Sequence, residues 1–207
     1  MNEEENLQRA LDMALAHADE VIVSDGGSTD STLSIAHSST ASVVSSEPGR
    51  GPQLNRGGAS ANSDILLFLH ADTTLPEGGL DQVRAAIGDG AVGGGFSVQF
   101  DAATFWFRVG SRIVNFRTRL TGIPLGDQGQ FVTAQVFASM GGYQPWPILE
   151  DLDFARRLKQ QGRLKILDSA VTTSARRYLA RGTIRTIATN WMIWTLFLVG
   201  VSPHRLA

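Results

Sequence analysis

The chain has 207 residues, 43% of them hydrophobic, a length that supports one well-packed domain and is short for two. It contains no cysteine, which excludes a disulfide framework and a thiolate zinc site. The net charge of -2 conceals an asymmetry, because residues 1–101 carry 15 acids and 4 bases whereas residues 102–207 carry 5 acids and 14 bases. We therefore expect the second half to face an anionic partner, although no recognition motif points to nucleic acid.

The N-terminal residues predict an amphipathic helix over 3–17. Asn2 followed by three glutamates is typical of a helix N-cap with acids in the first turn, and Leu7, Leu11 and Leu15 recur on one face. The acidic start also lacks the basic residues that open a secretory signal peptide, so we expect a cytoplasmic protein.

Strands and helices are expected to alternate along residues 21–87, a rhythm typical of βαβ units and of an α/β fold. The expected strands cover 21–24, 42–45 and 65–70, and the expected helices cover 30–38, 52–62 and 77–87. Gly90 to Gly95 then predicts a turn before a strand over 96–100, whose alternation indicates one solvent-facing side.

The second half is expected to be basic and aromatic. We predict helices over 102–122 and 149–161, followed by an arginine-rich segment and an apolar run over 191–199. That run is shorter than the ~20 residues of a membrane-spanning helix. Aromatic and arginine side chains together suit either core and dimer packing or docking on anionic lipid headgroups, with Arg176 and Arg177 as candidates for a lipid phosphate.

Two apolar strands each lead to an aspartate. The first run, 21–23, leads to Asp25 and Gly26, and the second, 65–69, leads to Asp72. Because open α/β sheets bind ligands at the carboxyl ends of their strands, we expect the two acids to converge on one crevice. The first carboxylate would accept from a ribose or base, and the second would hold a divalent cation over a diphosphate. Both acids also suit turns.

Four motifs in this order resemble the inverting nucleotide-sugar glycosyltransferases of family 2, which have the GT-A fold. The motifs are Asp25-Gly26-Gly27-Ser28-Thr29-Asp30-Ser31-Thr32, Gly49-Arg50-Gly51-Pro52-Gln53-Leu54-Asn55-Arg56-Gly57, His70-Ala71-Asp72 and Leu149-Glu150-Asp151. The resemblance covers nearly the whole chain. It implies a Rossmann-like, mostly parallel sheet flanked by helices, whose first strand is missing here ahead of the Asn-Glu-Glu segment.

The resemblance also implies roles for the motif residues. It places Asp25, Gly26 and Arg50 at the nucleotide, and it places Asp72 and His70 at a divalent-metal motif. The family usually has an acid where this chain has histidine, and imidazole suits Mn²⁺ better than Mg²⁺.

Two further motifs concern the sugar and the acceptor. The resemblance makes Asp151 the catalytic base, although acids in a first helical turn also satisfy the helix dipole. The segment Gly126-Asp127-Gln128-Gly129 resembles a motif in part of the family, and we expect its Asp127 and Gln128 to contact the sugar of the donor.

We predict one domain over 1–207, in which 1–101 bind the nucleotide sugar and 102–207 bind the acceptor and end in a basic aromatic C-terminal segment. The expected reaction moves a hexosyl group, with inversion and with Mn²⁺ or Mg²⁺, to an acceptor hydroxyl or to a lipid-linked phosphate at the membrane surface. A nucleotidyltransferase of similar fold, an inactive membrane-associated nucleotide-sugar-binding protein and a homodimer remain alternatives.

Overall fold

The strands lie in two separate sheets. A computed structural model describes residues 1–102, 104–176 and 183–207 of the chain. One sheet pairs β1 with β2, and the other holds five strands in the order β3-β6-β5-β7-β4. The strand bounds are β1 Ile22–Asp25, β2 Ser42–Ser45, β3 Ile65–Phe68, β4 Thr73–Thr74, β5 Gly93–Phe100, β6 Gln130–Thr133 and β7 Leu164–Thr173.

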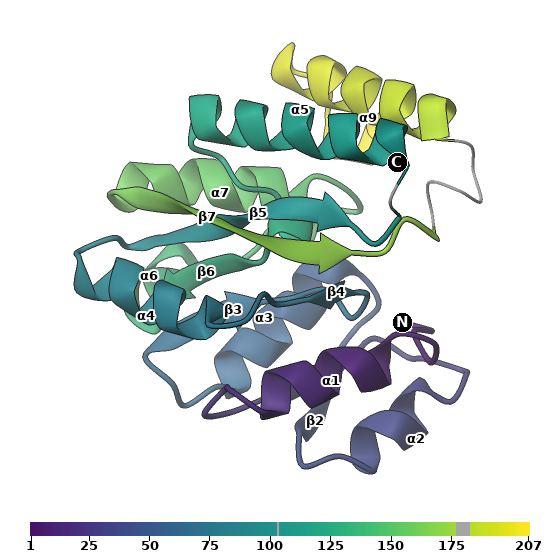
Figure 1. Ribbon diagram of the computed structural model, residues 1–207, viewed down its shortest axis with the longest axis vertical. Coiled ribbons are helices and arrows are strands. Elements are labelled where there is room, and N and C mark those ends of the chain that lie inside the picture. Colours follow the sequence, from purple (N-terminus) through teal and green to yellow (C-terminus); the bar gives the residue numbers. More distant parts are fainter. Residues whose placement is uncertain (103, 177–182) are drawn as a thin grey trace.

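Helices cover both sheets. Figure 1 shows α1, α2 and α3 around the two-stranded sheet at one end of the molecule, and α5 and α9 at the other end, beyond β5 and β7. The helix bounds are α1 Leu7–Leu15, α2 Thr32–His37, α3 Arg50–Ser60, α4 Gly79–Gly88, α5 Phe105–Thr121, α6 Ala134–Met140, α7 Glu150–Gln161, α9 Thr183–Leu198 and α10 Pro203–Leu206, with a 3₁₀ turn, η1, over Gly126–Gln128. None of the described helices combines the length and the hydropathy needed to cross a membrane.

The predicted α/β class is confirmed, but the sheet is mixed and not mostly parallel. β1 runs parallel to β2 and β5 to β7, whereas the pairs β3–β6, β5–β6 and β4–β7 are antiparallel. The apolar runs from which the strands were predicted are compatible with either direction. Strand direction follows from the connections, which the apolar pattern does not encode.

The glycines of the expected turn instead begin β5. A Cβ built on Gly93 would lie 2.5 Å from the Phe131 carbonyl oxygen, and one on Gly94 would overlap the Lys165 carbonyl oxygen of β7. Glycine is therefore the residue that lets the neighbouring strands approach this closely. The expected solvent-facing side is also wrong, because β5 is buried from Gly93 to Val98.

The N-terminal helix is shorter than predicted because Asn2 is not its N-cap. The backbone N–H of Asn2 donates to Ser28 Oγ at 3.0 Å, and its side-chain Oδ1 accepts from the Thr29 N–H at 2.9 Å. α1 begins only at Leu7. In the described residues no strand precedes α1. On β1, the Ser24 carbonyl accepts a hydrogen bond from the Gln53 side-chain amide at 3.2 Å.

Three apolar clusters hold the layers together. The first lies around β5, β7 and α4 and includes Phe96 and Val83, and another packs α1 against α2 and β1. The remaining cluster is aromatic: Tyr143 stacks on Phe154 with ring centroids 4.0 Å apart. This aromatic cluster lies beneath the start of α7, where the predicted base stands.

Candidate active site

Asp25 closes the loop that follows β1. Its carboxylate, in a residue only 5% exposed, accepts hydrogen bonds from the Gly27 and Ser28 N–H groups at 2.8 Å each and from the Ser28 hydroxyl. Burial raises the pKa of Asp25, but the hydrogen bonds from Ser28 and Gly27 outweigh it, so the pKa lies below the ordinary 3.8. Asp25 therefore stabilises the turn that follows β1, which was one of its two expected roles. Its carboxylate has about one of its four acceptor positions left for a ligand.

Gly26 lies directly against the first turn of α3. A Cβ on Gly26 would lie 3.0 Å from the Gln53 side chain. The same helix starts at Arg50, whose Nε lies 2.8 Å from Glu150 Oε1. Burial and the neighbouring Asp151 raise the pKa of Glu150, and Arg50 offsets part of that shift. The two predicted ends of the site, the nucleotide loop and the acidic pair, are thus joined by an ion pair.

Asp151 is held at the beginning of α7. The preceding Leu149 has a left-handed backbone with φ 64°, which costs a non-glycine residue about 1–3 kcal/mol. Asp151 Oδ2 accepts from the Gly126 N–H at 2.8 Å, and Oδ1 accepts from the Leu152 N–H at 2.7 Å. Each carboxylate oxygen keeps a lone pair free of these backbone donors.

His70 and Asp151 meet at Gly126. A Cβ built on Gly126 would lie 3.1 Å from Asp151 Oδ2 and 3.1 Å from His70 Nε2. The loop after β3 and the start of α7 therefore present their side chains to one point beside η1. A side chain at position 126 would therefore press against both groups.

Of the two residues predicted to contact the sugar, Gln128 does not face the site. Its side chain is 0% exposed: Oε1 accepts from Thr118 Oγ1 at 2.8 Å, and Nε2 donates to the Phe96 carbonyl at 3.0 Å. These hydrogen bonds hold η1 in place, so the Gln128 side chain is not directed toward the sugar as expected. Asp127 is half-buried in the same turn.

Asp72 lies in the loop after β3, two residues beyond His70. It lines a hollow of about 20 Å³ together with Asn6, Arg9 and Asp101, and its carbonyl accepts from the Ser174 N–H at 3.1 Å. No cluster of three or more potential metal-ligating side chains occurs within 1–102, 104–176 and 183–207. The predicted meeting of Asp25 with Asp72 is therefore not visible as a direct contact, because the carboxylate of Asp25 turns into its own loop.

A buried hydrogen-bonded chain supports Asp151 at the start of α7. The Tyr143 hydroxyl donates to Gln130 Oε1 at 2.9 Å, and Gln130 Nε2 donates to the Asp151 carbonyl at 3.0 Å. Burial, together with the charges of Asp151 and Glu150, raises the pKa of Tyr143 well above its ordinary value, so the hydroxyl stays a donor.

The sequence analysis missed this support and the role of Gly126. The glycines on either side of Asp127 and Gln128 marked the loop, but nothing in the sequence identified which of them lies against Asp151 and His70. Neither Gln130 nor Tyr143 stands in a motif. Arg176, a candidate for a lipid phosphate, instead pairs with Glu3 at 3.1 Å and Glu5 at 2.7 Å. The matching prediction for residue 177 lies outside the described residues.

Comparison with known proteins shows which class of fold this is. Staphylococcus aureus TarS 1–349 in complex with UDP-GlcNAc superposes with a TM-score of 0.60 at 20% identity, over 84% of this chain and 56% of that one. TarS 1–349 alone gives a TM-score of 0.65 at 16% identity, and the match covers 100% of this chain and 66% of that one. Glucosyl-3-phosphoglycerate synthase from Mycobacterium tuberculosis, solved with Mn²⁺, UDP-glucose and phosphoglyceric acid, gives 0.60 at 21%, over 84% and 68%.

These likenesses confirm the GT-A fold that the motifs implied. The chain spans only part of each of these structures, 56% in the case of the TarS complex. No curated protein sequence matches it. The model of the family "Glycosyl transferase family 2" matches residues 1–140, and the chain belongs to that family.

Proposed function

We propose that this chain transfers a hexosyl group from a nucleotide-diphosphate sugar to an acceptor, with Asp151 as the general base. The observation that carries the proposal is the meeting of Asp151 and His70 beside Gly126, where backbone N–H groups fix the Asp151 carboxylate. The family match and the donor molecules named for TarS and for the M. tuberculosis synthase support the donor class.

The donor would lie between the loop after β1 and the loop after β3. The backbone of Gly26 and the remaining acceptor position of Asp25 would contact the nucleoside, and Arg50, 43% exposed on its side chain, would approach the diphosphate from the start of α3. Asp72 and Asp127 would complete the donor contacts. In this division of labour, residues 1–101 bind the donor and 102–207 bind the acceptor.

His70 and Asp72 fit a divalent cation as a partial site. A carboxylate and an imidazole suit Mn²⁺, and the remaining ligands would come from the donor diphosphate and water. The ion would neutralise charge on the departing diphosphate. The M. tuberculosis synthase was solved with Mn²⁺ and UDP-glucose.

Asp151 would take the proton of the acceptor hydroxyl. Its two oxygens are fixed by the Gly126 and Leu152 N–H groups, so the carboxylate has one orientation and keeps lone pairs for the acceptor. Displacement in line with the departing diphosphate would invert the anomeric carbon. We propose that the acceptor is presented at the cytoplasmic face of a membrane, where the basic half would meet it.

A substitution at Gly126 tests the proposed role of Asp151 and His70. Gly126→Ala should abolish transfer while leaving nucleotide-sugar binding measurable by calorimetry, because the added methyl lies against Asp151 and His70 and not against the nucleotide loop. Gly88→Ala is the matched control, since a Cβ there meets nothing within 4 Å. Wild-type transfer by Gly126→Ala would refute the site.

A donor panel identifies the reaction. The protein is incubated with nucleotide sugars or nucleoside triphosphates, in the presence of Mn²⁺, Mg²⁺ or chelator, and the released nucleotide or pyrophosphate is analysed by chromatography. Release of a nucleoside diphosphate with sugar hydrolysis supports the proposal. Pyrophosphate release from a nucleoside triphosphate would assign the chain to the nucleotidyltransferases, and absence of turnover with every donor would favour an inactive binding protein.

A further inference from the structure

The exposed face of α5 carries most of the large apolar side chains that meet solvent. Eight such side chains are exposed in the described part of the chain, and five of them belong to α5: Phe105 63%, Trp106 67%, Ile113 49%, Phe116 69% and Leu120 75%. Two more, Met192 and Val199, belong to α9 and the residue after it, at the same end of the molecule (Figure 1). A concentration of this kind on one surface indicates a binding face.

The same helix is strongly basic. α5 contains four arginines and no aspartate or glutamate. Arg119 pairs with Asp168 at 2.9 Å, whereas Arg108 and Arg112 form no ion pair with any described residue. These two guanidinium groups therefore hold their charge available to a ligand.

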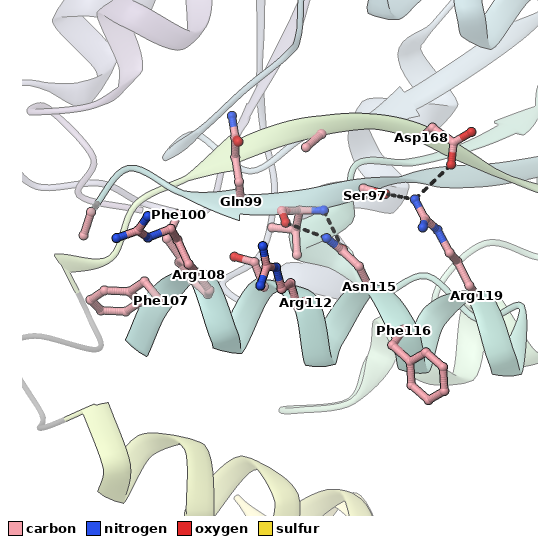
Figure 2. Close-up of a pocket in the computed structure, with 14 residues that line it drawn as sticks. Ser97, Gln99, Phe100, Phe107, Arg108, Arg112, Asn115, Phe116, Arg119 and Asp168 are labelled. Carbon is pink, nitrogen blue, oxygen red and sulfur yellow. Dashed lines mark hydrogen bonds and ion pairs between the residues drawn. The ribbon is translucent and has the colours of Figure 1, made fainter. Parts of the chain in front are cut away.

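A cavity of about 570 Å³ lies between α5 and β5, and Arg108 and Arg112 line it. Figure 2 shows both side chains on the side of α5 that faces β5. Asn115 is already engaged, because its amide bonds the Val98 backbone N–H and carbonyl at 2.8 and 3.0 Å. The free polar groups of the cavity are thus chiefly cationic, and they suit a phosphate.

We propose that α5 is a membrane-docking helix whose apolar face enters the interface of an anionic bilayer while Arg108 and Arg112 bind a phospholipid phosphate at the cavity. Phenylalanine and tryptophan favour the level of the headgroups, and each basic residue near an anionic membrane contributes about 1 kcal/mol. A helix that lies in the interface needs only this combination of an apolar face with arginines. This inference rests on the proposed function, for which it names the residues that would contact the membrane. Its test measures vesicle binding and does not require sugar transfer.

The test is co-sedimentation of the full chain with vesicles of phosphatidylcholine alone and of phosphatidylcholine with phosphatidylglycerol, at low and high salt. Wild type should bind the anionic vesicles and lose affinity as salt rises. Arg108→Gln with Arg112→Gln should weaken binding about 30-fold, from two lost charges. Arg56→Gln with Lys165→Gln, two exposed bases elsewhere, removes the same charge and should change affinity far less.

A second variant tests the apolar face. Trp106→Ser with Phe116→Ser should reduce binding to anionic vesicles with an unchanged melting temperature, since both side chains are exposed. Three outcomes would overturn the inference: no vesicle binding by wild type, equal loss in the control pair, or tight binding of inorganic phosphate by a protein that ignores vesicles. A change in sedimentation from dimer to monomer in the apolar variant, without a change in vesicle binding, would instead make α5 a contact between copies.

Discussion

Asp151 and Asp153 lie in the same turn of α7 but have different partners. Asp153 Oδ2 lies 2.6 Å from Arg157 Nε, whereas the Asp151 carboxylate meets only backbone donors among its hydrogen bonds. We predict that Asp151→Asn lowers transfer by about 10²–10⁴-fold, the range for loss of a general base, and leaves donor affinity unchanged. Asp153→Asn is the control, and comparable loss in both variants would show that the turn and not the base was disturbed.

The loop of Asp25 predicts a dependence of stability on pH. Because the folded-state pKa of Asp25 lies below the ordinary 3.8, its ionised form is favoured by folding; this stabilisation is present above pH 3.8 and is lost as the pH falls through the folded-state pKa. Asp25→Asn should therefore lower the free energy of unfolding at about pH 6 and cost less at about pH 3.

Urea unfolding of both proteins at the two pH values measures this difference. Asp30→Asn is a useful comparison, because Asp30 also has a lowered pKa but is half-buried and accepts from the backbone N–H of Thr32 at the start of α2. A constant gap between wild type and Asp25→Asn across the pH range would contradict the assigned hydrogen bonds.

At the scale of elements, β5 depends on having no side chains at its start. Gly94→Ala should destabilise the protein by about 1–3 kcal/mol or more, because the added methyl would overlap a β7 carbonyl and force the two central strands apart. Gly88→Ala, in open space at the end of α4, should be neutral or stabilising. Thermal and urea unfolding check both, and equal stability of the two variants would contradict the close strand approach.

The helices and strands show how much of the fold the sequence could predict. β2 occupies 42–45 as expected, and β1, β3, α3, α4, α5 and α7 lie within a few residues of their predicted bounds, because apolar periodicity and capping are local signals. β4, β6, α6 and β7 were not predicted. Their pairing partners lie far along the chain, and the glycines of β5 resemble a turn until the neighbouring strand is known.

The candidate site follows the same rule. Motifs singled out Asp25, Arg50, His70, Asp72 and Asp151 as candidates, but Gln128 carries no mark that distinguishes a ligand from a buried support. The close approach at Gly126 arises only because the loop after β3 and the start of α7 meet there. Information of that kind lies in tertiary packing.

At the scale of the whole molecule, Arg50 and Glu150 join the acidic and basic halves. We predict that Arg50→Met destabilises the fold by about 1–3 kcal/mol, less than the 3–5 typical of a fully buried pair because Arg50 is 43% exposed. Adding Glu150→Gln should restore much of the loss, since no uncompensated carboxylate then remains. A double-mutant cycle by urea unfolding measures the coupling.

The pH dependence of this pair has the opposite sign from that of Asp25. The pKa of Glu150 is raised above 4.5, so its contribution to stability is complete below that pH and is lost as the pH rises through the folded-state pKa. The loss on raising the pH should be steeper in Arg50→Met and absent in the double variant. An identical slope in all three proteins would show that Glu150 and Arg50 are not energetically coupled.

The backbone of Leu149 sets stability against activity. Its left-handed conformation stores strain immediately before Glu150 and Asp151, and glycine would adopt the same conformation without that strain. Selection for thermal tolerance alone would therefore favour relaxed variants at position 149, which would hold the proposed base Asp151 less firmly. Laboratory evolution of the chain toward heat resistance would need to measure sugar transfer in every round.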